Sequence, residues 1–268
     1  MHTSAPLDVD ALRADLLAPA GPWTRLDVVA RTGSTNADLL AASAAGAPDR
    51  TVLVAEVQEA GRGRLARSWV SPPGTGLTLS VLLRPVPVAP ARFGWIPLLA
   101  GLAVLDAVRE LTALPAALKW PNDLLLGSEG RKAAGILAEV APDGGVVLGI
   151  GFNVGAVADL PEGATSPAAE GVELDRTGSL RVLLLCLAAR DAQWRDGGGD
   201  PDASRLRSDY RAACASLGTE VRVDLPGGDA LTGIAEDVDG DGRLLLLDAH
   251  GRRRAVAAGD VVHLRPAF

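Results

Sequence analysis

The sequence predicts an α+β fold: a mixed sheet with helices on one side, followed by a small C-terminal β-barrel of the SH3-like size class. Strand and helix patterns in the first part of the chain do not alternate regularly, so they do not indicate successive βαβ units. From Gly218 onward the pattern changes to short, closely spaced strands without a helix. The 268 residues suit one large domain with a small companion. We expect an N-terminal extension over residues 1–23, a main domain over 24–217 and a β-domain over 218–268.

Periodicity and capping residues predict the elements of the first 111 residues. The stretch "DVDALRADLL" has the pattern of a short helix, and Ser34 or Thr35 can cap a second helix that stops at "GAP". Apolar and β-branched runs such as "TVLVAEV" predict strands. The expected elements, in order, are a helix over 8–17, a strand over 26–30, a helix to about residue 45, strands over 51–57 and 76–84, and a helix over 92–111.

Strand patterns crowd together in the middle of the chain. "AALKW" and "NDLLL" flank Pro121, while "KAAGILAEV" and "GGVVLGIGFNV" predict an antiparallel hairpin across the turn "APDGG". A loop and two helices follow, over 179–195 and 203–217, and Cys186 and Cys214 each fall inside one of these helices. Four or five short strands complete the chain.

Composition argues against several classes of protein. A formal net charge of −7 disfavours broad binding to nucleic acid or membrane surfaces. The N-terminus lacks the pattern of a signal peptide, and the most apolar helix falls short of the roughly 20 residues that span a bilayer. Two cysteines favour a reducing compartment, and three scattered histidines offer no zinc site. We therefore expect a cytoplasmic protein with no DNA and no membrane partner.

An arginine-rich stretch interrupts this acidic chain. "EAGRGRLARSWVSPPGTG", residues 59–76 and hereafter the arginine loop, follows an apolar strand that should project it from a sheet edge. Its glycines let the backbone approach a ligand, and its guanidinium groups suit phosphate or carboxylate. It is neither a P-loop nor a Rossmann turn, because no Gly-Lys-Ser/Thr follows and no βαβ unit opens there. Such a loop either binds an anion or is a solvated basic surface.

Four further stretches place polar residues where a ligand could reach them. In "KWPND", Lys119 ends an apolar run, and in "GRKAAGIL", Lys132 precedes small residues that allow packing on a flat ligand ring. In "GIGFNV", Asn153 ends an apolar strand, and "TGSTN" offers three short polar side chains at a helix N-terminus. A turn, a strand end and a helix N-cap are ordinary structural explanations for the first, third and fourth.

Taken in order, the five stretches resemble the bacterial biotin–protein ligases: "STN", then "GRGR" with a following Arg and Trp, then "KWPND", "K..GIL.E" and "G.G.NV". The resemblance spans Arg31 to about Gly155, and the small C-terminal β-domain fits it as well. "GRGR" combined with "KWPND" is its most specific part. The resemblance implies an α+β catalytic domain of the biotin/lipoate ligase type with a C-terminal SH3-like domain.

The resemblance implies an ATP-dependent activity. Such enzymes join biotin to ATP, giving biotinoyl-AMP and pyrophosphate. They then transfer biotin to one lysine of a biotin carrier domain, in acetyl-CoA carboxylase or a related carboxylase. Mg²⁺ is expected to accompany ATP, and no protein side chain is predicted as a metal ligand. The chemistry needs no protein nucleophile, which agrees with the absence of a Ser/His/Asp or Cys/His arrangement.

The resemblance also implies roles for individual residues. Biotin contacts are implied at Ser34, Thr35, Asn36, Gln58, Gly61, Arg62, Gly63, Arg64, Lys119 and Gly135. Nucleotide contacts are implied at Arg67, Trp69, Lys132 and Asn153. The catalytic residues implied are Lys119, Arg62 and Arg64, with Lys119 beside the biotin carboxylate and the α-phosphate. The glycines of the arginine loop predict that it is loose when empty and ordered by an anionic ligand.

Two substitutions depart from the family pattern: Ala133 stands where Leu is usual, and Phe152 where an aliphatic residue is usual. Both should alter packing and leave the charge unchanged. About 23 residues precede the expected catalytic domain, too few for a helix-turn-helix repressor domain. Two alternatives stay open: a lipoate–protein ligase, which shares the fold, and a non-catalytic biotin or nucleotide sensor.

Overall fold

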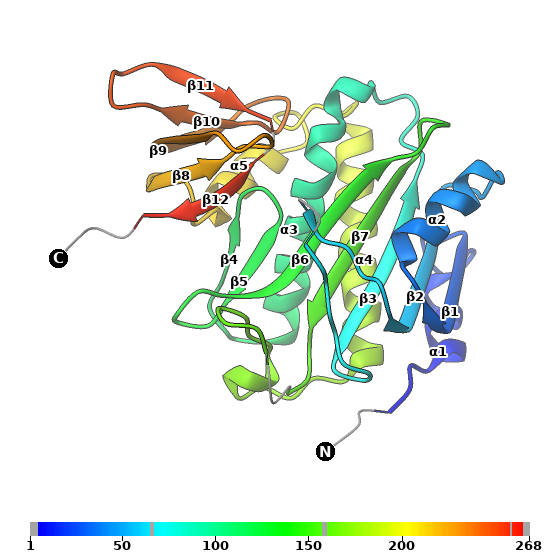
Figure 1. Cartoon of the computed structure of the whole chain (residues 1–268). Coiled ribbons are helices and arrows are strands. Elements are labelled where there is room, and N and C mark those ends of the chain that lie inside the picture. Colours follow the sequence, from blue (N-terminus) through cyan, green and yellow to red (C-terminus); the bar gives the residue numbers. More distant parts are fainter. Residues whose placement is uncertain (1–4, 65–66, 157–159, 258, 265–268) are drawn as a thin grey trace.

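The computed structural model describes residues 5–64, 67–156, 160–257 and 259–264, and a seven-stranded sheet forms the centre of its main domain (Figure 1). The strand order is β1-β2-β3-β7-β6-β5-β4. The pair β1–β2 is parallel and every other neighbouring pair is antiparallel, so the sheet is mixed as predicted. The strands are β1 (Arg25–Thr32), β2 (Thr51–Gln58), β3 (Gly76–Leu83), β4 (Ala116–Lys119), β5 (Asp123–Leu126), β6 (Arg131–Val140) and β7 (Val146–Asn153).

Helices cover both faces of this sheet. Helices α3 and α4 pack on one face, where Val81 and Leu148 belong to the main core. Helix α2 packs on the other face, over a second cluster that includes Leu82 and Val147. The expectation of helices on one side only was therefore wrong. The sequence of α2 predicts a helix but does not show which face of the sheet that helix covers. The helices are α1 (Val9–Leu16), α2 (Thr35–Ala44), α3 (Ile96–Leu111), α4 (Arg176–Asp196) and α5 (Leu206–Ala213), with 3-10 turns η2 (Pro90–Trp95) and η3 (Ala168–Glu170).

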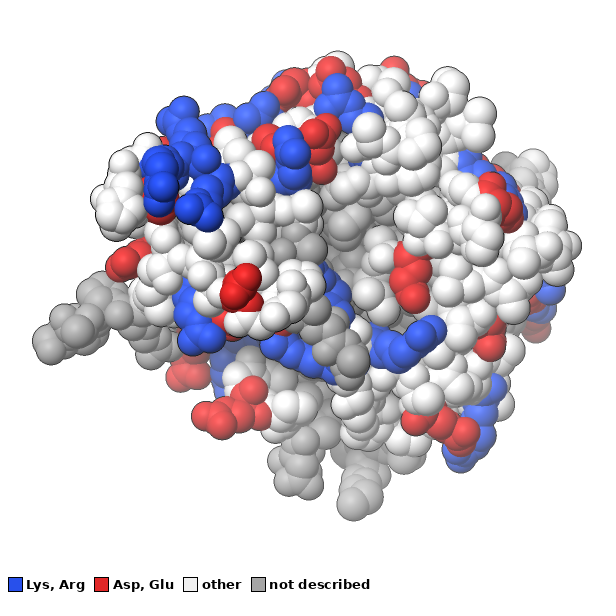
Figure 2. All heavy atoms as spheres, turned by 45° about the horizontal axis from the view of Figure 1, so that its top comes forward, with Lys and Arg blue, Asp and Glu red and all other residues white. Residues whose placement is uncertain are grey.

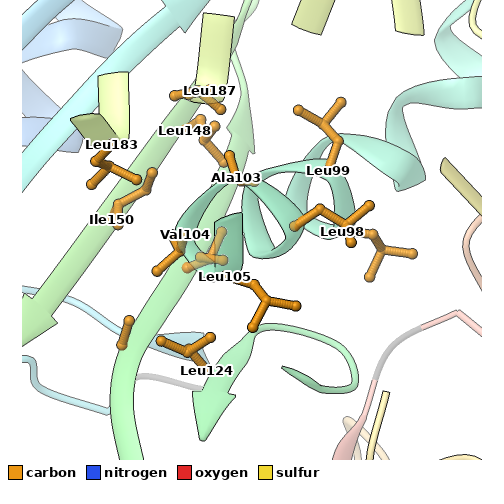
Figure 3. Close-up of a cluster of buried hydrophobic side chains, with 14 of the residues drawn as sticks. Leu98, Leu99, Ala103, Val104, Leu105, Leu124, Leu148, Ile150, Leu183 and Leu187 are labelled. Carbon is orange, nitrogen blue, oxygen red and sulfur yellow. The ribbon is translucent and has the colours of Figure 1, made fainter. Parts of the chain in front are cut away.

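The main core lies between α3, α4 and the sheet (Figure 3). Leu99 and Leu105 of α3, Leu148 of β7 and Leu187 of α4 are fully buried, and each such side chain contributes about 1.5–3 kcal/mol by leaving water. By length and composition the apolar segment Pro90–Leu111 could cross a membrane, contrary to the expectation from sequence. In the fold, 67% of its most apolar window is buried inside the protein, as in the core helix of a globular domain.

The chain after α5 forms a separate antiparallel sheet in the order β11-β10-β9-β8-β12. This confirms the predicted group of short C-terminal strands. Their side chains alternate between buried and exposed positions, so one face of the sheet is buried, and its apolar residues belong to the same core cluster as those of the main domain. The strands are β8 (Glu220–Asp224), β9 (Ala230–Val238), β10 (Leu244–Leu247), β11 (Arg253–Val256) and β12 (Asp260–His263).

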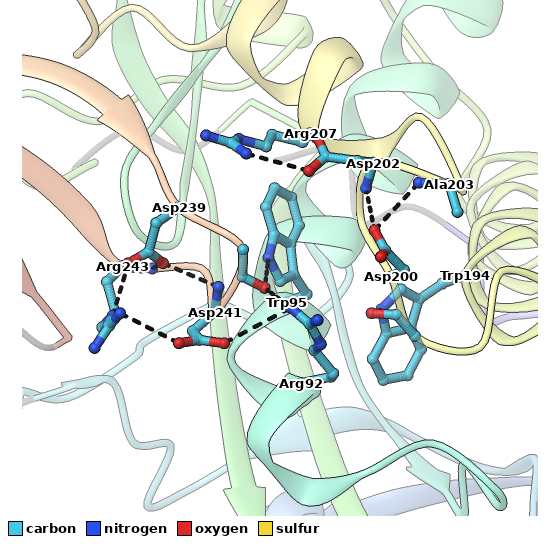
Figure 4. Close-up of polar contacts among 12 residues, drawn as sticks. Arg92, Trp95, Trp194, Asp200, Asp202, Ala203, Arg207, Asp239, Asp241 and Arg243 are labelled. Carbon is cyan, nitrogen blue, oxygen red and sulfur yellow. Dashed lines mark hydrogen bonds and ion pairs between the residues drawn. The ribbon is translucent and has the colours of Figure 1, made fainter.

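The turn between β9 and β10 docks this sheet onto the main domain (Figure 4). The indole N–H of Trp95 donates to the carbonyl of Gly240 at 3.0 Å, and that of Trp120 donates to the carbonyl of Gly242 at 3.1 Å. Arg92 also donates to the carbonyl of Gly240, at 2.8 Å. Both tryptophans are buried, so these bonds form away from water and hold the second domain against the start of α3 and the end of β4.

Several expected boundaries differ from those observed. Helix α5 ends at Ala213, so Cys214 lies at its C-cap and not inside it. The chain there joins the edge of β4 instead, where Ala215 N–H donates to the Leu118 carbonyl. Strand β2 lies between β1 and β3, so the arginine loop leaves the end of an interior strand and not an edge strand. These features depend on tertiary pairing, which local patterns do not contain.

A histidine at the junction of the two domains is partly buried. His263 of β12 lies with its Nε2 2.9 Å from the hydroxyl of Ser216. Burial lowers the pKa of His263, and the positive charge of Lys119 lowers it further. The neutral imidazole is therefore the form that fits the folded chain.

The stability of the chain should accordingly fall in mildly acidic solution. The pKa of His263 is below its ordinary value of 6.5 in the folded state, so the unfolded chain binds more protons below that pH and the free energy of unfolding decreases. Urea unfolding at pH 7.5 and at pH 5.5 measures this loss. His263→Gln should make the loss smaller, whereas the exposed His250→Gln should leave it as in the wild type. An equal loss in both variants would contradict the assignment to His263.

Candidate functional site

A pocket opens on the face of the main sheet that α2 only partly covers, beneath the arginine loop. Figure 2 shows basic side chains gathered around the hollow between the two domains. The pocket draws residues from both ends of the chain. It is lined by Ser34, Thr35, Asn36, Gln58, Arg62, Gly63, Arg64, Arg67, Ser68, Trp69, Thr78, Leu79, Asn122, Asp123, Lys132, Gly135, Ile136, Leu137, Gly149, Ile150, Gly151 and Asp260.

One end of the pocket is polar and uncharged. Ser34 is the N-cap of α2, and its hydroxyl accepts a bond from the Ala37 N–H. The Thr35 N–H donates to Gln58 Oε1 at 2.9 Å, which ties the start of α2 to the end of β2. The structure thus brings Ser34, Thr35 and Gln58 together as predicted, although they lie 23 to 24 residues apart in the sequence.

The other end is cationic. The Lys132 ammonium lies 2.6 Å from a carboxylate oxygen of Asp123 and 5.9 Å from the centre of the Trp69 ring. Arg64 is half-buried and donates to the Gly259 carbonyl at 3.3 Å. Burial lowers the pKa of Arg64, while Asp260 and Asp123 act in the opposite direction.

The C-terminal domain contributes to this end of the pocket. Asp260 of β12 forms an ion pair with Arg67 of the arginine loop, and its carboxylate is only 13% exposed. The sequence had not singled out Asp260, because it lies nearly 200 residues beyond the loop and carries no motif of its own. Residues 65 and 66 of the loop lie outside the described residues, and the predicted looseness of the empty loop stays a prediction.

Missing side chains on two strands make room for the pocket. A Cβ atom at Gly151 would collide with the Trp69 indole, and one at Gly135 would lie 3.2 Å from it. Gly149 gives similar room to Asn36. The flat ring that Gly135 was expected to accommodate in a ligand is thus the protein's own Trp69 in this structure. Gly149 and Gly151 belong to the "G.G.NV" stretch of the resemblance, but neither had been given a role of its own.

Three of the implied site residues are not among the residues that line the pocket: Lys119, Gly61 and Asn153. Lys119 is the last residue of β4, and its positive charge lowers the pKa of His263. Gly61 is buried behind the lining, against Gln58 and Trp69. Asn153 is also buried, and its amide donates to the Thr165 carbonyl at 3.0 Å. The two positions that depart from the family pattern, 133 and 152, are both in the core, where they affect packing as expected.

Two family models match the chain. The model of the "Biotin/lipoate A/B protein ligase family" matches residues 28–155, which include the pocket strands and the arginine loop. The model of the "Biotin protein ligase C terminal domain" matches residues 216–264. The biotin--[acetyl-CoA-carboxylase] ligase of Mycobacterium tuberculosis is 50% identical over 266 residues, which cover 97% of each chain. The chain belongs to the biotin/lipoate A/B protein ligase family.

Further relatives agree with this assignment. The chain is 35% identical to the biotin--[acetyl-CoA-carboxylase] ligase of Paracoccus denitrificans over 86% of its own length and 98% of that protein. Its fold is similar to that of the biotin protein ligase from Aquifex aeolicus solved in complex with biotin and ATP. The two structures superpose with a TM-score of 0.74 at 28% identity, and the match covers 91% of this chain and 100% of the other.

The position of the Trp69 ring against the sheet can be tested without any ligand. Gly151→Ala adds a Cβ atom that collides with the indole, so the ring must move toward solvent. The other four tryptophans are at most 1% exposed, so the rise in fluorescence quenching by iodide should come from Trp69. Gly33→Ala is the matched control, because its Cβ would meet nothing within 4 Å. Unchanged quenching in Gly151→Ala, at unchanged thermal stability, would contradict the packing of the Trp69 indole over Gly151.

Proposed function

We propose that the chain is a biotin–protein ligase. It activates biotin with ATP to give biotinoyl-5'-AMP and pyrophosphate. It then transfers the biotinoyl group to one lysine of a biotin carrier domain, in acetyl-CoA carboxylase or a related carboxylase, and releases AMP. Support comes from the family membership, from the relatives described above, and from the way the pocket divides into a neutral and a cationic end.

The division of the pocket is the observation that carries the proposal. Biotin joins a neutral ureido ring to a carboxylate, so its ring suits the end formed by Ser34, Thr35 and Gln58. Its carboxylate and the triphosphate of ATP suit the end that contains Lys132 and Arg64. A pocket for a neutral ligand would not need the second end, and a site for phosphate alone would not need the first.

The basic side chains would lower the barrier of the first step, in which a carboxylate oxygen of biotin attacks the α-phosphate of ATP. Both reactants are negatively charged, and charge accumulates around phosphorus in the transition state. Lys132, Arg62 and Arg64 lie where they can offset that charge, and loss of one such donor costs about 3 kcal/mol. Arg67 and Trp69 would lie beside the nucleotide; the buried indole N–H of Trp69 has no partner among the described residues.

Mg²⁺ is expected to arrive with ATP. Among the described residues, no group of three or more His, Cys, Asp or Glu side chains could hold a metal. The pocket offers Asp123 and Asp260, each paired with a basic residue. Mg²⁺ is commonly bound through one or two carboxylates together with substrate phosphates, so this set fits an ion held mainly by ATP. When bound, the ion would neutralise phosphate charge.

The cell compartment and the partners follow from the same chemistry. ATP and newly made carboxylases are found in the cytoplasm, which we propose as the site of the reaction. Both cysteines are free, which agrees with a reducing compartment. The partners proposed are biotin, ATP and the carrier domain; the acidic net charge gives no reason to add DNA or a membrane.

One reaction mixture tests the proposal directly. The chain is incubated with ATP, Mg²⁺, labelled biotin and a carrier domain, and both pyrophosphate and labelled carrier are measured. We expect both products. Pyrophosphate without labelled carrier would point to a wrong acceptor, and neither product, at demonstrable biotin binding, would favour a non-catalytic sensor. Preference for lipoate over biotin would identify a lipoate–protein ligase.

The two candidate lysines give opposite expectations. Lys132 lines the pocket and Lys119 does not, so we propose that Lys132 meets the reacting groups, in place of the role that the resemblance implied for Lys119. Lys132→Ala should lower the rate of biotin-dependent pyrophosphate release by about 10²–10³-fold, and Lys119→Ala by less than tenfold. Lys132→Arg should recover part of the loss. A deeper loss in Lys119→Ala, with an unchanged melting curve, would restore the assignment made from sequence.

A further inference from the structure

A buried serine next to the neutral end of the pocket has no role in the proposed chemistry so far. Ser80 of β3 is 0% exposed, and all eight residues of this strand are buried. Its hydroxyl oxygen lies 2.7 Å from Thr35 Oγ1 and 2.6 Å from Asn36 Oδ1. A buried hydroxyl is costly unless it is hydrogen-bonded, and both partners here belong to the first turn of α2.

The orientation of the Asn36 amide determines how these bonds run. Its Nδ2 donates to Glu139 Oε2 at 2.7 Å and to the Leu137 carbonyl at 3.3 Å. A carboxylate and a carbonyl can only accept, so both amide protons point toward β6 and Oδ1 points toward Ser80. Both amide protons of Asn36 are thus used within the protein, and only a second lone pair of Oδ1 is left for the direct biotin contact that the resemblance implied.

The direction of each remaining bond follows from counting protons. Asn36 Oδ1 can only accept, so the single hydroxyl proton of Ser80 goes to it. The Ser80 oxygen can then accept from Thr35, whose other neighbour, Gln58 Oε1 at 3.2 Å, is also an acceptor. The Thr35 proton is used inside the protein with either partner. Thr35 Oγ1 therefore offers only lone pairs to the pocket.

The neighbouring groups have the opposite polarity. Gln58 Oε1 already accepts the Thr35 N–H, so the amide N–H₂ of Gln58 is its remaining group. Ser34 Oγ accepts from Ala37, which leaves its own proton for the pocket. The wall thus combines donors at Ser34 and Gln58 with an acceptor at Thr35. A cyclic urea has the complementary pattern, because its carbonyl accepts and its ring N–H groups donate.

We propose that Ser80 and Glu139 are positioning residues for ureido recognition: through Asn36 they fix the direction of a hydrogen-bond chain that presents Thr35 to the ligand as an acceptor. This inference rests on the proposed function. Glu139 accepts from the amide nitrogen of Asn36 and Ser80 donates to its amide oxygen, and neither residue lines the pocket. Without them the Thr35 proton is held only by the longer 3.2 Å bond to Gln58 Oε1, which also accepts the Thr35 N–H. That proton can then turn toward a urea N–H, and the two donors oppose each other.

The test separates binding of biotin from every other property of the enzyme. Ser80→Ala removes the link, and we expect the KM for biotin to rise about tenfold, with kcat and the KM for ATP within about twofold of wild type. Ser80→Cys keeps the volume and supplies a weak S–H donor, so its KM for biotin should lie between the two. Glu139→Gln should raise the same KM by less than Ser80→Ala, since the Leu137 carbonyl still holds Asn36.

The matched control is another buried, hydrogen-bonded serine. Ser43 of α2 is 1% exposed and bonds to Asp143 at 2.9 Å, away from the pocket. Ser43→Ala should lower the melting temperature without changing the KM for biotin. A KM for biotin within twofold of wild type in Ser80→Ala would overturn the inference, as would equal changes in the KM for biotin and for ATP. If the wild-type chain itself does not bind biotin, the proposed function fails and this inference with it.

Discussion

The site depends on the absence of side chains at three glycine positions of β6 and β7. Gly149 and Gly151 follow each other on one face of β7, with Gly135 beside them on β6, so the sheet has a depression at its centre. Side chains at those positions would fill the space that Asn36 and Trp69 now occupy. The start of α2 and the arginine loop can approach the sheet only because that surface is bare backbone. Everything else in the pocket is arranged around these two inserted side chains.

Much of the architecture could be predicted from local patterns. The hairpin of β6 and β7, the strand that ends at Lys119 and the N-cap at Ser34 each follow from alternation or capping within a few residues. The face covered by α2 and the end of α5 could not be predicted in this way. Both depend on contacts with strands far away in the sequence, which propensity does not encode.

The same limit applied to the site. Residues within a recognisable motif, such as Arg64 and Lys132, were found, and the structure brings both to the pocket. Ser80 and Asp260 escaped notice because each is one ordinary polar residue in a strand. Their importance comes from partners 44 and 193 residues away, Asn36 and Arg67. Lys119 shows the converse, since this motif residue is not among the residues that line the pocket.

The way the two domains are joined has a consequence for how the sequence can vary. Trp95 and Trp120 donate their indole protons to backbone carbonyls of the turn between β9 and β10, so these two bonds depend on the path of that turn and not on its side chains. Gly242 must stay small, because its φ is +81° and its neighbour Gly94 is close. Side chains elsewhere on the outer surface of the small domain can be exchanged without loosening the joint. That surface can therefore diverge to suit different protein partners while the pocket beneath it keeps its geometry.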